Sequence, residues 1–429
     1  MKAHSNDHAL EQVPLEERRP WWEITFVTSG FSMAVSGMFA GAALSAGMSL
    51  KQIILAILIG NLVLALYGGL TGAIGAKTGV STTMLARRAF GRFGSLIISL
   101  VWAVTLIGWF SVQAGFFGHT IHTMYPEGGF FSSVPVAASW GGILMILTAY
   151  FGYKGIRLLS NIAIPLLLLL SLFGIYLGIS HVGGWNNLSQ TITEPISIVE
   201  GIVLVVGTFA VGAVIQPDIS RYAKSSKDSW IAILIGMVIA NGFIVFAGAV
   251  TALSMGTGDL PAAMLQIGLG FPAMLVLIAA QWTSNDSNLY SASLALSNIV
   301  RVSKNKIVMA VGLTATAIGA AGLADYLTDW LVALGIAIPP VAGILIADYY
   351  LIHKQRYRFG PGTTYAKVVW PAFIAWLLGI LAGSYIQWGI PSLTSLLVAL
   401  LVHWGLFVIG RRTNLKLTSG DTLEKEDGF

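Results

Sequence analysis

Cysteine is absent from the sequence, so no disulfide framework and no thiolate metal or redox site can form. Charge is scarce as well, because 10% of the 429 residues are charged whereas 55% are hydrophobic. Soluble domains carry about 25% charged residues. Most of this chain is therefore expected to lie in a lipid bilayer. The polar start, Met1 to Arg19, has no apolar run and does not resemble a cleavable signal peptide, so the first hydrophobic segment is expected to direct insertion.

Long hydrophobic runs make up most of the remaining sequence. A membrane-spanning helix needs about 20 consecutive apolar residues. Runs of this kind predict about twelve helices, which begin near Ile24, Ile53, Leu96, Val134, Leu158, Ile196, Trp230, Phe271, Ile307, Trp330, Val368 and Leu393. The connections between them are short, and no linker or low-complexity segment indicates a separate soluble domain. The sequence therefore predicts an all-α polytopic membrane protein.

The 24 lysines and arginines are distributed unevenly over the predicted connections. All but Lys51 fall in the two tails or in the connections that follow helices two, four, six, eight and ten. Positive residues are enriched on the cytoplasmic side of membrane proteins, so both termini are expected in the cytoplasm, and a bacterial inner membrane is the expected location. Because the bases are scattered, the net charge of +5 does not indicate a nucleic acid partner. The tails carry no recognisable partner motif, and no obligate protein partner is expected.

Two of the predicted helices carry small and polar residues halfway along their length. These are the stretches Ser29–Gly37 in helix one and Gly207–Gly212 in helix six. Glycine and serine often serve close helix packing in membranes. Helices one and six are five apart, however, and run in opposite directions, as an inverted repeat of five helices requires. Broken backbone at this depth survives only where it lines a cavity, so the pattern predicts a polar cavity near the membrane midplane.

Helices three and eight supply polar side chains at a similar depth. Helix three has Trp109 and Gln113 near its centre, and helix eight has the run Trp282–Asn288. Within that run, the adjacent hydroxyls of Thr283 and Ser284 suit a hard monovalent cation. The alternative for such hydroxyls is a hydrogen bond to the preceding turn of their own helix.

Asp286 is the only acid in the middle of a hydrophobic run. An intramembrane ionisable group is a candidate functional group. Three roles fit this one: a contact with substrate, the orientation of the neighbouring Asn285, or the capping of a helix break.

The sequence argues against three other classes of membrane protein. A membrane enzyme would show clustered histidines, a pair of acids or a nucleotide loop, and the seven histidines are dispersed. A channel would show rings of repeated polar residues, whereas one central polar cluster suits alternating access. A transporter of amino acids is disfavoured by the aromatic and amide residues of the central cluster.

Several motifs together resemble the nucleobase:cation symporter-1 family, whose members include the bacterial cytosine permeases and the hydantoin permeases. The resemblance covers nearly the whole chain. The motifs that carry it are Gly75–Gly79, Ala86–Gly91, Gly108–Phe110, Val206–Phe209, Asp218 with Arg221, Trp282–Asp286, Ile338–Pro340 and Ile346–Tyr349.

The resemblance implies the five-plus-five inverted-repeat fold of sodium-coupled amino-acid transporters, followed by two additional helices. The implied division is a cytoplasmic tail over residues 1–21 and a ten-helix transport core over 22–352. Within the core, the first repeat covers about 22–180 and the second about 195–352. Helices eleven and twelve occupy 353–410, and a second cytoplasmic tail occupies 411–429.

The resemblance also implies a substrate and a coupling ion. The substrate is a small planar nucleobase, imported by a symporter, and the residues that match the family's substrate site are Trp109, Gln113, Thr208, Phe209, Asn285, Asp286 and Asn288. The ion is sodium, with a proton as the alternative, and the residues that match the family's cation site are Ala34, Gly37, Ala280, Thr283 and Ser284.

The chain departs from the cytosine-permease pattern at three positions. Leu106 stands where that pattern has a glutamine, and Val211 stands where it has a serine. Gln113, one turn after Trp109, resembles the hydantoin-permease arrangement. The expected substrate is therefore cytosine or a related purine or pyrimidine, and hydantoin, allantoin or a hydroxymethylpyrimidine is the alternative.

Overall fold

The computed structural model describes residues 11–413 except 152, 189–191, 193–194, 298, 301, 358, 360–362 and 387. The described residues are helical and form no strand, apart from one isolated bridge between Arg19 and Ala223. The helices are α1 (Trp21–Ser32), α2 (Val35–Gly47), α3 (Leu50–Thr78), α4 (Thr82–Phe90), α5 (Gly94–Met124), α6 (Val134–Phe151), α7 (Tyr153–His181), α8 (Ile198–Val214), α9 (Pro217–Ser220), α10 (Ser226–Leu234), α11 (Gly242–Met255), α12 (Leu260–Gln266), α13 (Gly270–Ser297), α14 (Lys304–Ala320), α15 (Leu327–Ala337), α16 (Pro339–Ile346), α17 (Trp370–Tyr385) and α18 (Pro391–Thr413). Two π-helical segments, η4 (Ile235–Asn241) and η6 (Ala347–Ile352), continue α10 and α16.

The structure confirms the prediction of an all-helical membrane protein. Within the described residues, 7 helices are long and apolar enough to cross a bilayer, and the bent pair α1 and α2 adds one more if it counts as a single span. Three further apolar helices, within α6, α14 and α17, are shorter. Each hydrophobic run found in the sequence coincides with an observed helix or begins within two residues of one.

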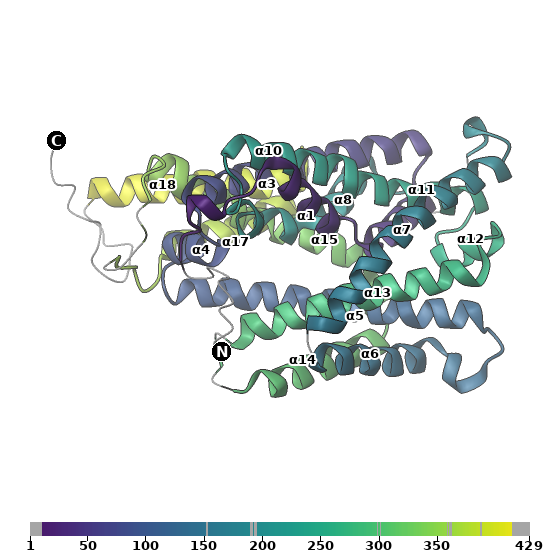
Figure 1. Cartoon of the computed structure of the whole chain (residues 1–429). Helices are drawn as coiled ribbons and strands as arrows, with labels where there is room; N and C mark the ends of the chain where they lie inside the picture. The colour runs from purple at the N-terminus through teal and green to yellow at the C-terminus, as the bar shows by residue number, and fades with distance from the viewer. Residues whose placement is uncertain are drawn as a thin grey trace.

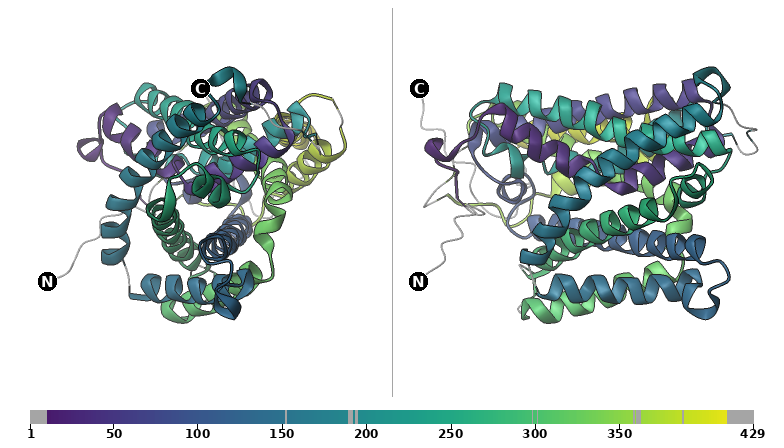
Figure 2. Two further views of the ribbon diagram at one scale, coloured as in Figure 1. Left: turned by 90° about the vertical axis from the view of Figure 1, so that its right-hand side faces the viewer. Right: turned by 45° about the vertical axis from the view of Figure 1, so that its right-hand side comes forward.

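The helices form two groups that face each other (Figure 1). On one side of the molecule, α5, α6, α13 and α14 pack together, and on the other side α3, α8, α10 and α11 lie close to one another (Figures 1 and 2). The helices α1 and α2 pack on α10 and α11, and α17 and α18 pack on each other and on α16. Most of these helices run roughly parallel or antiparallel along the long axis in Figure 2.

Helix one is broken where the sequence predicts it. It ends at Ser32 and resumes at Val35, and the two halves, α1 and α2, meet at 54°. Met33 (ψ 62°) and Ala34 (ψ 143°) leave the helical region between them. The Met33 N–H still donates to the Ser29 carbonyl at 3.0 Å, but the backbone leaves the regular helical path here and can face a cavity.

Helix six is distorted rather than interrupted. Phe209 in α8 has φ −136° and ψ 20°, outside the helical region. Neighbouring carbonyl groups of α8 lie against hydroxyls of α3. The Tyr67 hydroxyl donates to the Ala210 carbonyl at 3.1 Å, and the Thr71 hydroxyl lies 3.0 Å from both the Ala213 carbonyl and the Tyr67 carbonyl of its own helix. The remaining two polar helices, α5 and α13, are continuous.

Glycines allow α2 to lie against α11 backbone to backbone. A Cβ atom at Gly41 would overlap the Val245 carbonyl, and one at Gly248 would overlap the Met38 carbonyl. Small residues at helix crossings permit this close approach in membranes, where no hydrophobic effect drives helices together. This crossing fixes the second half of helix one against the scaffold.

A carboxylate in the first turn of η6, the segment that continues α16, links this segment to α18. Asp348 is buried, and its oxygens lie 3.3 Å from His353 Nδ1 and 3.4 Å from His403 Nε2. The Tyr357 hydroxyl also donates to Asp348. Burial and the charge of Arg88 lower the pKa of His353, and the Asp348 carboxylate raises it. The carboxylate prevails, so the pKa of His353 lies above its usual value.

We expect Gly248→Ala to destabilise the protein by at least about 2 kcal/mol, because the added methyl group would force the backbones of α2 and α11 apart. The measurement is the midpoint of thermal unfolding in detergent. Gly405→Ala in α18 is the matched control, since no atom lies within 4 Å of the added Cβ there. Equal midpoints for the two variants would contradict the assigned crossing.

The His353–Asp348 contact predicts a pH dependence of stability. A histidine whose folded-state pKa is raised stabilises the protein fully below its unfolded pKa of about 6.5, and this contribution is lost as pH rises through the folded pKa. The unfolding midpoint of the wild-type protein is therefore expected to fall on that rise, and His353→Gln should flatten the curve. His181→Gln, at an exposed histidine, should leave the curve unchanged; identical curves for all three proteins would refute this role.

Candidate functional site

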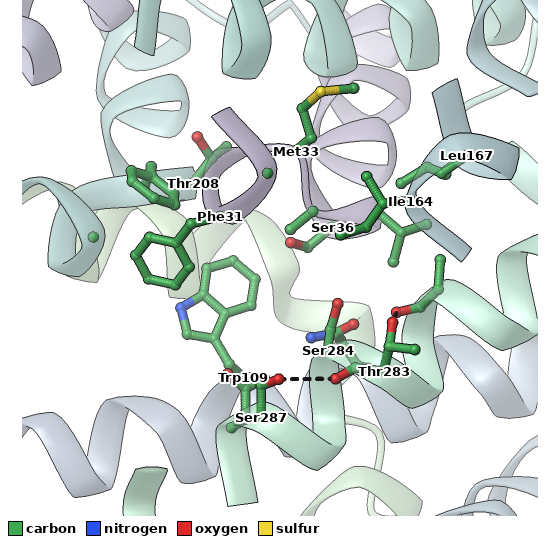
Figure 3. Close-up of a pocket in the computed structure, with 18 of the residues that line it drawn as sticks. Phe31, Met33, Ser36, Trp109, Ile164, Leu167, Thr208, Thr283, Ser284 and Ser287 are labelled. Atoms are coloured by element: carbon green, nitrogen blue, oxygen red, sulfur yellow. Dashed lines mark hydrogen bonds between the residues drawn. The ribbon is translucent and has the colours of Figure 1, made fainter. Parts of the chain in front are cut away.

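A cavity of about 730 Å³ lies where the break in helix one meets α5, α7, α8 and α13 (Figure 3). Its lining residues are Phe26, Val27, Gly30, Phe31, Met33, Ala34, Val35, Ser36, Leu106, Trp109, Gln113, Ala163, Ile164, Leu167, Thr208–Gly212, Ile215, Ala280, Thr283, Ser284, Ser287 and Asn288. None of these residues has an ionisable side chain. The cavity therefore suits a neutral solute that is held by stacking and by hydrogen bonds.

Aromatic side chains lie on two sides of the cavity. The Trp109 side chain extends from α5 towards Phe31 of α1 (Figure 3). Phe31 in turn meets Phe209 edge to face, with ring centroids 4.9 Å apart and an interplanar angle of 70°. Aromatic faces at this position suit a flat π-system.

Three side chains can read the edge of such a ring. Gln113 is 2% exposed and lines the cavity, and its Oε1 atom has no hydrogen-bond partner among the described residues. An unpaired buried acceptor is costly, so an N–H group from a ligand would relieve it. Asn288 also lines the cavity, and the Thr208 hydroxyl lies beside the distortion of α8, donating to the Val205 carbonyl at 2.7 Å.

The oxygen-rich part of the cavity lies between the break in helix one and α13. Ala34 faces it from the break, and Ala280, Thr283 and Ser284 face it from α13. The Thr283 hydroxyl donates to the Ala280 carbonyl at 3.0 Å, which leaves its lone pairs available to a cation. Thr283 and Ser284 share one face of α13 with Ala280, because residues three and four apart are neighbours on a helix.

Two predicted substrate residues, Asn285 and Asp286, do not line the cavity in this structure, and their contact with substrate stays a prediction. Both are almost fully buried on the opposite face of α13. Asn285 Nδ2 donates to the Phe110 carbonyl at 3.1 Å, and Asp286 accepts a 2.7 Å hydrogen bond from the hydroxyl of Thr148 on α6. The reason is the helical period of 3.6 residues, which turns positions 285 and 286 away from the face that carries Ser284, Ser287 and Asn288.

One predicted cation ligand, Gly37, is also absent from the lining. It lies in the first turn of α2, where its N–H donates to the Ala34 carbonyl at 2.9 Å. A Cβ on Gly37 would lie 2.6 Å from Ile244 Cγ2, so the residue faces α11. The α-carbon of Gly37 thus packs against α11, and the role of its carbonyl as a cation ligand stays a prediction.

Sequence reasoning did not assign several residues that the structure places in the cavity. Phe31 and Ser36 lie inside the polar stretch of helix one, which was recognised without assigning them. Ser287 shares the helical spacing of Thr283, so the periodicity of α13 predicts it. Ile164 and Leu167 come from α7, where the only signal is Pro165 inside the helix.

The described residues contain no group of three or more histidine, aspartate or glutamate side chains that could hold a metal ion. A divalent or transition metal prefers such ligands. The oxygen set on α13 and at the break is neutral, and it suits a singly charged cation instead.

Comparisons with known proteins agree with this geometry. The family described as "permease for cytosine/purines, uracil, thiamine, allantoin" matches residues 12–402. The cytosine permease of Escherichia coli strain K12 is 32% identical over 418 residues, which cover 97% of this chain and 98% of that protein. The hydantoin permease of Microbacterium maritypicum is 27% identical over 409 residues, which cover 87% of this chain and 83% of that protein.

The fold is also that of a solved transporter. The structure titled "Inward facing conformation of Mhp1" superposes with a TM-score of 0.83 at 22% sequence identity, and covers 94% of this chain and 93% of that chain. The family match over residues 12–402 and the 32% identity to the E. coli cytosine permease confirm the family resemblance found in the motifs. The chain therefore belongs to the nucleobase:cation symporter-1 family of permeases, and it is a membrane transporter rather than an enzyme.

Proposed function

We propose that this permease is a symporter that imports a nucleobase, cytosine or a related purine or pyrimidine, together with sodium. One observation carries the proposal: an uncharged cavity between the two distorted helices joins the Trp109 indole to the unpaired amide oxygen of Gln113. A neutral, flat ring with N–H groups at its edge satisfies both. The E. coli cytosine permease, at 32% identity, supports this class of substrate.

In the proposed complex, the ring stacks on Trp109, with Phe31 and Phe209 closing the side opposite α5. Gln113 accepts a hydrogen bond from a ring N–H, and Asn288 offers both a donor and an acceptor. Recognition by amides rather than by charge selects neutral heterocycles, since a charged ligand would enter this site without a counter-ion.

Sodium is the coupling ion that the neutral oxygen set fits. Ala34, Ala280, Thr283 and Ser284 supply carbonyl and hydroxyl oxygens, the hard ligands that a small monovalent cation prefers. One sodium ion entering with each substrate gains about 2.3 kcal/mol per 100 mV of membrane potential. At full coupling, this gain alone supports roughly fiftyfold accumulation of substrate. A proton is the alternative coupling ion.

Alternating access follows from the proposed architecture. We infer twelve spans in a five-plus-five inverted repeat, with α17 and α18 outside the core. The distortions in α1–α2 and in α8 lie in helices that correspond between the repeats, which supports this assignment. The positive-inside pattern supports cytoplasmic termini in a bacterial inner membrane.

A second candidate substrate class is hydantoin, allantoin or a hydroxymethylpyrimidine. Leu106 and Gln113 both line the cavity, so the amide lies one turn after Trp109 and an apolar side chain lies one turn before it. This arrangement resembles the hydantoin-permease pattern. Both classes use the same stacking face, and they differ in which ring edge meets Gln113.

Uptake of radiolabelled cytosine into proteoliposomes tests the substrate site. We expect Trp109→Ala to lower the apparent affinity by at least about tenfold, because aromatic stacking of a base contributes about 1–3 kcal/mol. Trp404→Ala, on α18 and outside the cavity, is the control. Excess unlabelled adenine, hypoxanthine, uracil, hydantoin or allantoin then ranks the ligands. Absent cytosine uptake with hydantoin or allantoin uptake would select the second class, and unchanged uptake in Trp109→Ala would contradict stacking.

The cation site predicts a separate change. Ser284→Ala and Thr283→Val should raise the sodium concentration for half-maximal uptake by about tenfold, because a bond to a charged group contributes about 1.5–3 kcal/mol. Thr314→Val, whose hydroxyl bonds only within α14, is the control. Uptake that follows an imposed pH gradient and ignores sodium would replace sodium by a proton.

A further inference from the structure

The π-helical segment η4 lies between the two distorted helices and bonds to both. It occupies Ile235–Asn241 in an otherwise α-helical span, Ser226–Met255. A π-helix pairs residues five apart, and such segments are rare and often occur at functional sites. Neither end of η4 lines the cavity.

The first end of η4 contacts helix one directly before its break. The Ser32 hydroxyl lies 2.8 Å from the Gly236 carbonyl and 3.0 Å from the Ser29 carbonyl of its own helix. Ser32 is 1% exposed, and a Cβ on Gly236 would lie 2.6 Å from Thr28 Cγ2. Met33 and Ala34, the non-helical residues of the break, follow Ser32 immediately.

The second end of η4 contacts helix six directly before its distortion. Asn241 Nδ2 donates to the Thr208 hydroxyl at 3.2 Å and to Asn61 Oδ1 of α3 at 2.8 Å. Asn61 is held in turn by a 2.8 Å bond from its Nδ2 to the Ile57 carbonyl. Phe209, the distorted residue, follows Thr208.

The π-helical geometry is what brings the two contacts together. Gly236 and Asn241 are five residues apart, which is the spacing that a π-helical hydrogen bond joins. In a regular α-helix the same spacing would turn them about 140° away from each other. The contacts are also buried in an apolar bundle, where an unpaired amide or hydroxyl is costly. Loss of the hydrogen bond at one end of η4 is therefore expected to disturb η4 and, with it, the hydrogen bond at the other end.

We propose that Ser32 and Asn241 are positioning residues that couple the cation site to the substrate site through η4. The inference rests on the proposed function, because it assigns the cation to the break beside Ala34 and the heterocycle to the region of Thr208 and Phe209. Cation binding restricts the backbone at the break in helix one. The bond from Ser32 to Gly236 then restricts η4, and the bond from Asn241 holds the Thr208 hydroxyl in place. By linkage, the substrate strengthens cation binding by the same factor.

Binding measurements on the purified full-length protein test the coupling. The coupling is measured as the dissociation constant of cytosine in choline chloride divided by that in sodium chloride. Hydantoin is the probe if cytosine does not bind. We expect Ser32→Ala and Asn241→Leu each to reduce the ratio by at least about fivefold, and the double variant to reduce it little further. Thr251→Val is the control, since that buried hydroxyl bonds within α11 at 2.8 Å to Ala247. A ratio in both variants equal to that of the control overturns the proposal.

A second measurement does not depend on substrate or ion. The chain has no cysteine, so Val27→Cys introduces a single thiol. Val27 lies on α1 and lines the cavity, and the rate at which a maleimide labels the new thiol reports how readily this part of helix one moves. Asn241 bonds to α8 and α3, yet we expect Asn241→Leu to accelerate this labelling by at least about fivefold. Thr251→Val should not accelerate it. Equal rates in the two variants overturn transmission through η4, whereas a wild-type protein without any sodium effect on binding overturns only the assignment of sodium.

Discussion

Backbone hydrogen bonding without water constrains every distorted helix in this protein. In hydrocarbon an unpaired carbonyl costs several kcal/mol, so a broken helix persists only where protein neighbours or a polar cavity satisfy its backbone groups. Here the Tyr67 and Thr71 hydroxyls of α3 lie against carbonyls of α8. The Ser32 hydroxyl at the end of α1 lies within bonding distance of a carbonyl of η4. These contacts satisfy carbonyl groups beside the distortion of α8 and within η4.

Close packing of helices outside the cavity also holds the distorted helices in place. The backbones of α2 and α11 meet at Gly41 and Gly248, and a Cβ on Gly207 of α8 would overlap the Leu331 carbonyl of α15. These crossings leave no room for a side chain, so the positions of the broken helices are set by van der Waals contact. The cavity between them is thus largely preformed, which limits the ordering cost of binding.

The polar groups of the cavity come from two kinds of helix, continuous and distorted. Continuous helices α5 and α13 present side chains at regular spacing, such as Trp109 and Gln113 on one and Thr283 and Ser284 on the other. The distorted helices present backbone as well, at Met33–Ala34 and around Phe209. Rigid helices are suited to orient a stacked ring, and the breaks are suited to change shape when an ion binds.

The sequence by itself determined the hydrophobic runs, the polar stretches of helices one and six, and the hydroxyl-bearing face of α13, because each depends on composition or on the helical period. The same period, applied to Asn285 and Asp286, would have turned both away from the cavity. Tertiary structure decided the rest. The position of Phe31 in the cavity lining depends on how helices distant in sequence are rotated against each other. The contact of Gly37 with α11 and the bonds from η4 to Ser32 and Thr208 depend on the same rotation. That rotation is set by contacts across the bundle, which a one-dimensional pattern does not contain.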